Sequence, residues 1–330
     1  MSRLPLALGL LVFASNPEAA RGDSSMAVTR IPLSARQQAC GGAYGSYDVL
    51  GVVENPASLA TQRRMIEVNA ADQYLFSSGE NVLGLGVGWM NGSADTGAWG
   101  VAVVAAQVFT ASFNEVDELG NATGRRVSPV GRRFDLATAY QRSSVAVGAS
   151  MGTAAESYGS LPDDAGKGPS GVQLAVGTLA SFDRWSAGAA VQFRGLGGPA
   201  GIPGVVSAGG SVEEAGLRFN ASMLAPLAGP AGPAVLAGFR WPVSDSFDLQ
   251  GAYNASFATG VAASLGGSVR IGFSVRSTRV GMDYTLVVPL SSGLGMTHLI
   301  TLGWSFGNRR SSPQASPPVP SPAESASPNP

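Results

Sequence analysis

The sequence predicts an all-β fold, namely a transmembrane antiparallel β-barrel of the outer-membrane type with about 14 strands, about 12 being the second choice. A short N-terminal helix or plug segment should precede the barrel. Three observations lead to this prediction. Apolar and polar residues alternate in segment after segment, the polar face carries little charge, and large aromatic residues stand near the expected strand ends.

The alternation is clearest near the C-terminal end. Between residues 268 and 276, Val269, Ile271 and Phe273 fall on one face of an extended chain, while Ser268 and Gly272 fall on the other. Comparable alternation occurs in 83–90, 134–141, 144–151, 172–182, 184–194, 217–223, 235–241, 247–257, 279–288 and 298–306. Strict alternation over about ten residues is typical of a transmembrane strand.

The composition of the polar face separates a membrane barrel from a soluble sandwich. A sandwich face that meets water usually carries many charged side chains, whereas here it carries Gly, Ser, Ala and a few Arg. The apolar face carries tryptophans that would suit an interfacial girdle of a bilayer. These are Trp89, Trp99, Trp185, Trp241 and Trp304.

Composition excludes several other classes of protein. Of 330 residues 45 are Gly and 13% are charged, against about 7% and about 25% in ordinary domains. A net charge of −1 without basic clusters argues against nucleic-acid binding. One Cys and one His cannot build a disulfide framework or a structural zinc site. We therefore expect no cofactor and no metal site, and a free, packed thiol at Cys40.

The ends of the chain differ from the barrel region in composition. Residues 1–20 resemble a signal peptide, with Arg3 before the apolar stretch Leu4 to Ala14. Cleavage after Ala14 or near Ala19 and Ala20 fits, and a buried N-terminal strand or helix is the alternative. Residues 308–330 are rich in Pro and Ser and should be disordered.

The remaining chain divides into two parts. Residues 21–64 form the N-terminal plug or hatch-like segment, in which 21–40 look like an irregular leader, and residues 65–307 form the barrel. Long extracellular loops are expected at 112–131, 154–170 and 195–211. Short periplasmic turns are expected at Arg142-Ser143, Asp183 and Thr278.

Two stretches resemble a known family. Cys40-Gly41-Gly42-Ala43-Tyr44 followed by Glu54-Asn55-Pro56-Ala57-Ser58-Leu59-Ala60 is similar to the "GGAY … NPAGLA" opening of the PorV/PorQ family, within the FadL-like outer-membrane barrels. The hairpin from Gly281 to Phe306 is similar to that family's C-terminal ending. The chain departs from the family at Ser58, where Gly is usual, at Cys40, and in its Pro/Ser tail.

The resemblance implies a fourteen-stranded outer-membrane barrel with a short N-terminal segment near or inside its periplasmic mouth. FadL-like members admit hydrophobic molecules, and PorV-like members serve type IX protein secretion. The expected partners are outer-membrane lipid, a hydrophobic small molecule, secretion or envelope-complex proteins and the barrel assembly machinery. A structural anchor in a motility or adhesion complex is the alternative function.

The candidate plug motif consists of Gly41, Gly42, Asn55, Pro56 and Ala57. Asn55 can cap a helix whose first residue is Pro56. The lumenal face of the strands offers glycines that permit close approach of another backbone. These are Gly84, Gly86, Gly88, Gly148, Gly188, Gly238 and Gly272. An ordinary capped helix beneath the periplasmic rim is the alternative.

A second candidate group is a lumenal polar strip of Arg270, Arg276, Arg279 and Asp283. It would either guide an anionic head group or form a charge ladder that fixes strand register and binds the plug. His298 is interpreted as a boundary residue of its strand.

Two further features concern assembly and catalysis. Trp304 and Phe306 fit the aromatic C-terminal signal that outer-membrane assembly reads on a final strand. With a single His and no evident nucleophile motif, we expect no enzymatic activity.

Overall fold

The computed structural model describes residues 27–29, 31–42, 48–62, 64–75, 80–116, 121–159, 167–196, 204–227, 232–257, 265–290 and 295–308. The expected signal peptide at 1–20 lies outside the described residues, as does the Pro/Ser tail apart from Asn308. No helix within the described part of the chain is long and apolar enough to cross a membrane.

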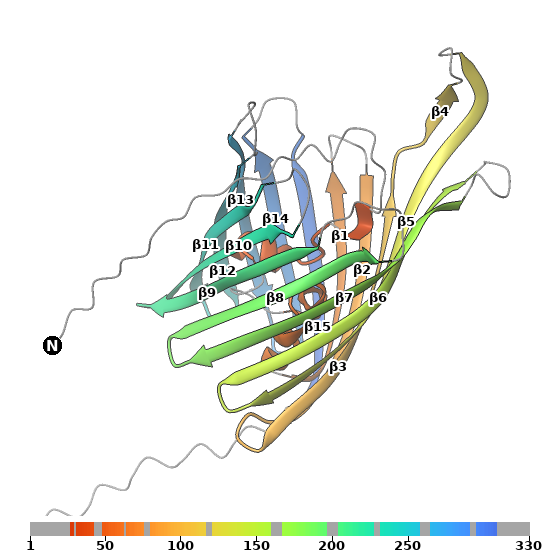
Figure 1. Ribbon diagram of the computed structural model, residues 1–330. Coiled ribbons are helices and arrows are strands. Elements are labelled where there is room, and N and C mark those ends of the chain that lie inside the picture. The colour runs from red at the N-terminus through yellow and green to blue at the C-terminus, as the bar shows by residue number, and fades with distance from the viewer. Residues whose placement is uncertain are drawn as a thin grey trace, which may run out of the picture.

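The strands pair with their neighbours in the chain and close into an antiparallel barrel of 14 strands, which confirms the predicted fold (Figure 1). Closure occurs where β1 pairs with β15 and where β3 pairs with β5, while short β4 (Phe113–Val116) pairs with β5 outside the ring. The strands of the ring are β1 (Arg64–Leu75), β2 (Glu80–Ser93), β3 (Gly97–Phe109), β5 (Ala122–Arg142), β6 (Val145–Gly159), β7 (Lys167–Phe182), β8 (Trp185–Leu196), β9 (Val205–Glu214), β10 (Leu217–Pro226), β11 (Ala234–Ser244), β12 (Phe247–Phe257), β13 (Leu265–Arg276), β14 (Val280–Pro289) and β15 (Thr297–Asn308).

Short turns join the strands at one edge of the barrel. They occupy residues 94–96, 143–144, 183–184, 215–216, 245–246 and 277–279. The start of β1 and the end of β15 meet at the same edge, because Arg64 pairs with Asn308. We call it the short-turn edge, and the turns expected around Ser143, Asp183 and Thr278 belong to it.

The expected long loops are wrong in large part. Segment 112–131 contains β4 and the first half of β5, segment 154–170 contains the end of β6 and the start of β7, and segment 195–211 contains most of β9. Strand β5 continues for 21 residues, because β4 and β6 pair with its first half, at the end away from the short-turn edge. Strand β9 shows no alternation of apolar and polar residues, because its central residues, Ser207 to Ser211, are all small.

Burial alternates along the strands and identifies the two faces of the wall. In β3, Ala102 and Val104 face inward and are buried, whereas Val101 and Val103 are exposed on the outer face. The outer face is apolar on many strands, and its exposed side chains include Leu85, Leu136, Met151, Val176, Phe219 and Ile271.

All five tryptophans lie toward the short-turn edge. Trp99 and Trp185 follow a turn by at most three residues, and Trp241 precedes one. Trp304 pairs with Val280, the first residue of β14. Trp89 packs edge-on against Trp99, with ring centroids 4.7 Å apart. The outer face therefore carries its largest amphipathic rings at one edge of the barrel.

The N-terminal helices lie within the ring (Figure 1). They are η2 (Ala27–Thr29), α1 (Ala35–Cys40), η3 (Val49–Val53) and η4 (Pro56–Thr61). Helix α1 differs from the irregular leader that the sequence predicts for 21–40, and Ser34 and Gly41 are its caps. We call the described residues between 27 and 62 the inner segment.

Glycines of the wall let the inner segment approach the strands closely. A Cβ added to Gly148 would lie 2.5 Å from the backbone of Pro56 and Ala57, and one on Gly238 would lie 2.7 Å from the Cys40 carbonyl. A Cβ on Gly272 would lie 2.8 Å from the Ala39 side chain. Real Cβ atoms do not approach other atoms so closely, so these positions cannot accept a side chain while the inner segment stays in place.

We expect Gly148→Ala to destabilise the folded chain by about 1–3 kcal/mol, because the methyl group would overlap fixed backbone. Urea unfolding of the purified barrel in detergent measures the change. Gly281→Ala is the matched control, because a Cβ there would meet its nearest atom at 3.6 Å. Equal stability of the two variants would contradict the close contact at Gly148.

Candidate functional site

Helix α1 is the part of the inner segment that lies on β11 to β15. Ser34 caps its start, since its Oγ accepts a hydrogen bond from the Gln37 N–H at 3.1 Å. Gly41 ends it in the left-handed conformation, with φ of 88°. All the α1 residues except Arg36 are buried, so the helix is enclosed by the wall.

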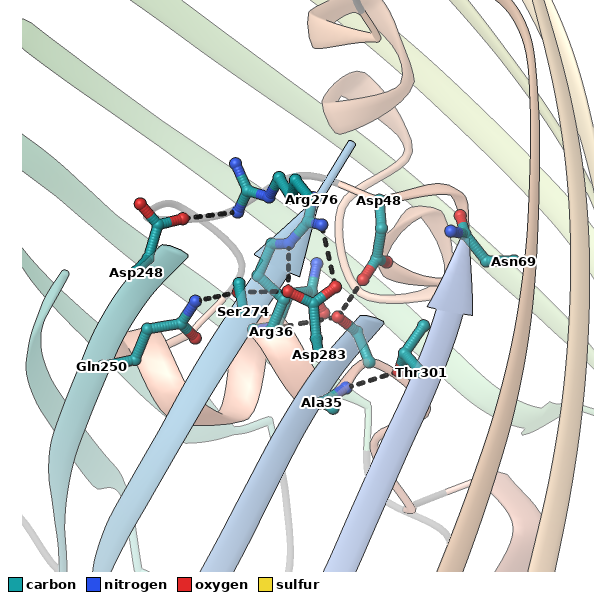
Figure 2. A network of polar contacts seen from close by, with 12 residues as sticks. Ala35, Arg36, Asp48, Asn69, Asp248, Gln250, Ser274, Arg276, Asp283 and Thr301 are labelled. Carbon is teal, nitrogen blue, oxygen red and sulfur yellow. Dashed lines mark hydrogen bonds and ion pairs between the residues drawn. The ribbon is translucent and has the colours of Figure 1, made fainter. Parts of the chain in front are cut away.

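Arg36 forms a bidentate ion pair with Asp283 of β14 (Figure 2). Its Nε and Nη2 donate to the two carboxylate oxygens at 3.0 and 2.8 Å. Ser274 also donates to Asp283, and Gln250 donates to Ser274, so residues of three neighbouring strands form one chain of hydrogen bonds that ends at this carboxylate. Burial lowers the pKa of Arg36, but the charge and hydrogen bonds of Asp283 raise it more, and the guanidinium stays charged.

Asp48 connects the caps of two helices. Its Oδ1 accepts from the Gly51 N–H at 3.0 Å and so caps η3, while the Ser34 hydroxyl donates to its Oδ2. Helices α1 and η3 are thus joined through one carboxylate (Figure 2). Burial raises the pKa of Asp48 above its ordinary value, although Arg36 and the Ser34 hydrogen bond act in the opposite direction.

Wall side chains also bind backbone groups of the inner segment. Thr301 and Thr285 bind the two backbone polar groups of one residue, because the Ala35 N–H donates to Thr301 Oγ1 at 3.1 Å and Thr285 Oγ1 donates to the Ala35 carbonyl at 2.7 Å. Further bonds join Asn69 to Val49 N, Arg133 to Thr29 O, Gln192 to Glu54 O, Ser222 to Gly41 O and Arg270 to Gln38 O. The partners come from strands on several sides of the ring, so the inner segment is held from more than one direction.

The lumen has an apolar sector and a polar sector. On β2 and β3 the wall presents Val82, Met90 and Val104, which belong to one buried cluster with Val49, Leu50 and Leu59 of the inner segment. On β12 to β15 it presents Gln250, Ser274, Asp283, Thr285 and Thr301. Helices η3 and η4 therefore pack by apolar contact, and α1 is held by polar contacts.

The structure places the residues of the candidate plug motif on this wall. Asn55 caps η4 by accepting from Ala57 N at 3.1 Å, and its amide donates to the Thr178 carbonyl at 3.3 Å. Pro56 and Ala57 lie over Gly148. Gly41 and Gly42, with φ of 88° and 112°, lie against β10 and β11.

The candidate polar strip is divided by the structure. Arg270 and Asp283 contact the inner segment, and Arg276 shares Asp248 with Arg240 at 3.1 and 2.8 Å. Arg279 is exposed in the turn after β13 and lies apart from these three. The strip is therefore a set of contacts to the inner segment together with a ladder along the wall.

The other residues singled out in the sequence lie outside this network. Trp304 and Phe306 are on the outer face of β15, with Phe306 exposed. His298 accepts from or donates to the Tyr284 hydroxyl through Nδ1 at 2.7 Å. Cys40 is buried in the wall contact, and burial raises the pKa of its thiol to about 12.

Sequence reasoning missed Arg36, Asp48, Ser34 and the two threonines that hold Ala35. Their partners lie far away along the chain: 247 residues separate Arg36 from Asp283, and 266 separate Ala35 from Thr301. The Ser34 and Gly41 capping signals could have revealed α1, but no local pattern shows which wall residue meets it.

Comparison of the fold with solved structures finds similar barrels. The toluene transporter TodX of Pseudomonas putida matches with a TM-score of 0.56 at 13% identity, over 83% of this chain and 98% of that one. A TodX deletion mutant described as a monoaromatic hydrocarbon channel matches with a TM-score of 0.55 at 14% identity, over 83% and 99% of the two chains. At these identities the likeness concerns the fold. Neither a protein-family model nor a curated protein sequence matches this chain.

We expect Arg36→Met to lower the free energy of unfolding by about 3–5 kcal/mol, because it leaves the Asp283 carboxylate buried without its cation. Denaturant titration of the refolded barrel measures the loss. Arg184→Met is the matched control and should cost less than about 1 kcal/mol, because the Arg184–Glu214 pair is exposed. Removing both partners in an Arg36→Met/Asp283→Leu variant should recover part of the loss. A single variant as stable as the control would exclude a structural role for the buried pair.

The stability contributed by Asp48 should fall as the pH rises. Because burial raises its pKa, the folded chain binds the Asp48 proton more tightly than the unfolded chain, whose value is near 3.8. That contribution is complete below pH 3.8 and is lost as the pH rises through the higher pKa of the folded chain. The loss of unfolding free energy caused by Asp48→Asn should therefore be larger at about pH 4 than at about pH 7. Parallel unfolding curves in metal-free buffer test this, and a difference independent of pH would contradict it.

Proposed function

We propose that this chain is a non-enzymatic bacterial outer-membrane barrel of the FadL-like class, through which small hydrophobic molecules pass when the inner segment moves. The observation that carries the proposal is the apolar sector of the lumen. Helix η3 packs mainly on β2 and β3, and η4 packs mainly on β5 to β7. The buried cluster around them takes Val, Met and Ala from β2 and β3, and Ala137, Ala139, Ala146 and Leu179 from β5 to β7. No charged residue lies on β2 between Val82 and Met90 or on β3 between Ala98 and Val108, and the two charges buried on β5 are paired, Arg133 with Asp135.

Two features support the membrane location. The outer face of the strands exposes large apolar side chains such as Met151, Val176 and Ile271, which have no favourable place in water. The tryptophans gathered toward the short-turn edge suit the boundary between lipid tails and head groups. Because transmembrane barrels have short periplasmic turns and longer extracellular loops, we assign the short-turn edge to the periplasmic side.

The solute class follows from what the inner segment covers. If η3 and η4 left their place, the wall behind them would offer apolar surface to whatever entered, whereas the wall behind α1 would offer Asp283, Arg270 and hydroxyl groups. Apolar surface favours a hydrophobic solute over an ion or a sugar. The likeness to a barrel described as a toluene transporter agrees with this class.

A second candidate function is that of a closed barrel within a protein secretion system or another envelope complex. The contacts that hold the inner segment from several strands favour it, because a barrel filled in this way can serve as an anchor without passing any solute. The PorV/PorQ resemblance of Gly41-Gly42 and Asn55-Pro56-Ala57 belongs to this proposal. Secretion or envelope proteins would then be its partners.

A reversible disulfide between the inner segment and the wall tests the transport function. A Cβ on Gly86 would lie 3.5 Å from the Val49 Cβ, within the separation of about 3.5–4.5 Å that a disulfide requires. In a Cys40→Ser background, Val49→Cys with Gly86→Cys would fix η3 to β2. Oxidation should reduce toluene uptake into proteoliposomes, and reduction should restore it, if passage needs η3 to move.

The control disulfide joins wall to wall. A Cβ on Gly84 would lie 3.6 Å from the Ala71 Cβ of β1, so Ala71→Cys with Gly84→Cys links two strands to each other and forms no covalent bond to η3. Oxidation of this control should leave uptake unchanged. Two results would reject transport and favour the closed anchor. One is uptake that stays the same when the disulfide between positions 49 and 86 forms, and the other is no uptake by the unmodified barrel.

A further inference from the structure

Two charged side chains lie on the outer face of the ring, Asp72 on β1 and Arg132 on β5. Both are exposed, and the residues that follow them, Gln73 and Arg133, are buried on the lumenal face. Asp72 pairs with Leu83 of β2, which is itself exposed on the outer face. Both charges therefore point away from the lumen.

Few other charged residues face outward in the part of the ring that the structure describes. Arg142 and Glu214 are the last residues of β5 and β9 and adjoin short turns. Arg126 lies on the part of β5 that pairs with β4 beyond the ring. Asp72 and Arg132 differ from these three because they lie within the wall.

Apolar side chains surround the two charges on the outer face. Tyr74 and Phe109 lie one step further from the short-turn edge, Phe134 lies one step nearer to it, and all three are exposed. A charge that faces lipid tails is unfavourable unless it meets a partner. Within the described residues, neither Asp72 nor Arg132 has a hydrogen-bond or ion-pair partner.

The strand register places Asp72 and Arg132 at the two ends of one row. The row crosses β1, β2, β3 and β5, which are consecutive in the ring (Figure 1). Asp72 pairs with Leu83, and Leu83 pairs with Gln107. Gln107 in turn pairs with Arg132. Neighbouring strands are about 4.8 Å apart, so about 14 Å separates the ends of the row, which is too far for an ion pair within one chain.

We propose that two copies of this chain associate through the outer face of β1, β2, β3 and β5, with Asp72 of each copy paired with Arg132 of the other. A two-fold axis along the membrane normal, between Leu83 and Gln107, exchanges the two ends of the row and so forms the ion pair twice. Because the strands tilt by about 35–45°, the paired residues differ in height, and the long side chain of Arg132 reaches along the wall to the carboxylate.

Complementary charge favours a second copy over lipid as the occupant of this face. A lipid phosphate would bind Arg132 but repel Asp72, whereas a second copy provides a partner for both. Beside the row, Ala70 and Ala105 are small enough to let two walls approach closely. This inference goes beyond the proposed function, because association on the outer face does not decide whether a solute passes the lumen.

Cross-linking at the centre of the row tests the association. In a Cys40→Ser background, Gln107→Cys places one thiol beside the two-fold axis. Ile271→Cys, on the exposed outer face of β13, is the matched control. The full-length barrels are reconstituted at low density in lipid vesicles and treated with a short, membrane-permeant bis-maleimide. We expect a cross-linked dimer on gels for Gln107→Cys and a monomer for Ile271→Cys.

Exchange of the charges tests the ion pair itself. Added to the Gln107→Cys barrel, Asp72→Arg should lower the cross-linked fraction at least about tenfold, because guanidinium groups would then face each other. Arg132→Asp alone should do the same, and the variant with both substitutions should recover the dimer. If Asp72→Arg does not fold, Asp72→Asn provides the test, since it removes the carboxylate from each pair. Heat-modifiable migration on gels confirms that each variant is folded.

Three results would overturn the proposal. The first is a Gln107→Cys barrel that cross-links no more than the Ile271→Cys control. The second is a cross-linked fraction that the single exchanges leave unchanged or that the double exchange does not restore. The third is a monomer that loses bound lipopolysaccharide on Arg132→Gln, measured by mass spectrometry, since the arginine would then bind a lipid phosphate.

Discussion

The need of buried backbone groups for hydrogen-bond partners governs this structure. The inner segment is made of one helical turn after another, and such short helices leave most of their N–H and C=O groups without partners inside the helix. Enclosed by the wall, these groups depend on residues such as Thr285, Thr301 and Ser222. The hydroxyls and amides of the lumenal face are therefore ligands for a peptide chain.

The same constraint explains why the lumenal face is poor in charge. The wall of a wide aqueous channel faces water and can carry many ionised side chains. The wall of a lumen that is filled by polypeptide backbone must offer neutral donors and acceptors, or no side chain at all. Gly148 and Gly238 provide flat surface, and Thr285 provides a hydroxyl. Several of the buried charges that remain are paired, as Arg133 is with Asp135 on the wall and Asp283 is with Arg36 of the inner segment, because a buried charge without a partner is costly.

The architecture could be predicted from the sequence because strand alternation is a local signal. Strand β9 was missed because Ser207, Gly209 and Ala208 give almost no contrast between its faces. Around the inner segment, the Asn55-Pro56 helix start can be read from adjacent residues. The partners of Arg36 and Ala35 cannot, since they depend on which strands the closed ring brings opposite α1.

The distance along the chain between the inner segment and its partners sets an order of assembly. Residues 34–42 are synthesised before β13 to β15, yet they obtain hydrogen bonds from Arg270, Asp283 and Thr301. The first part of the chain must therefore wait, without its final contacts, until the last strands are present. Strand β15 also closes the ring against β1. Closure of the ring and the last contacts of the inner segment are therefore completed together, and in an unclosed barrel the inner segment would lack its final contacts with the wall.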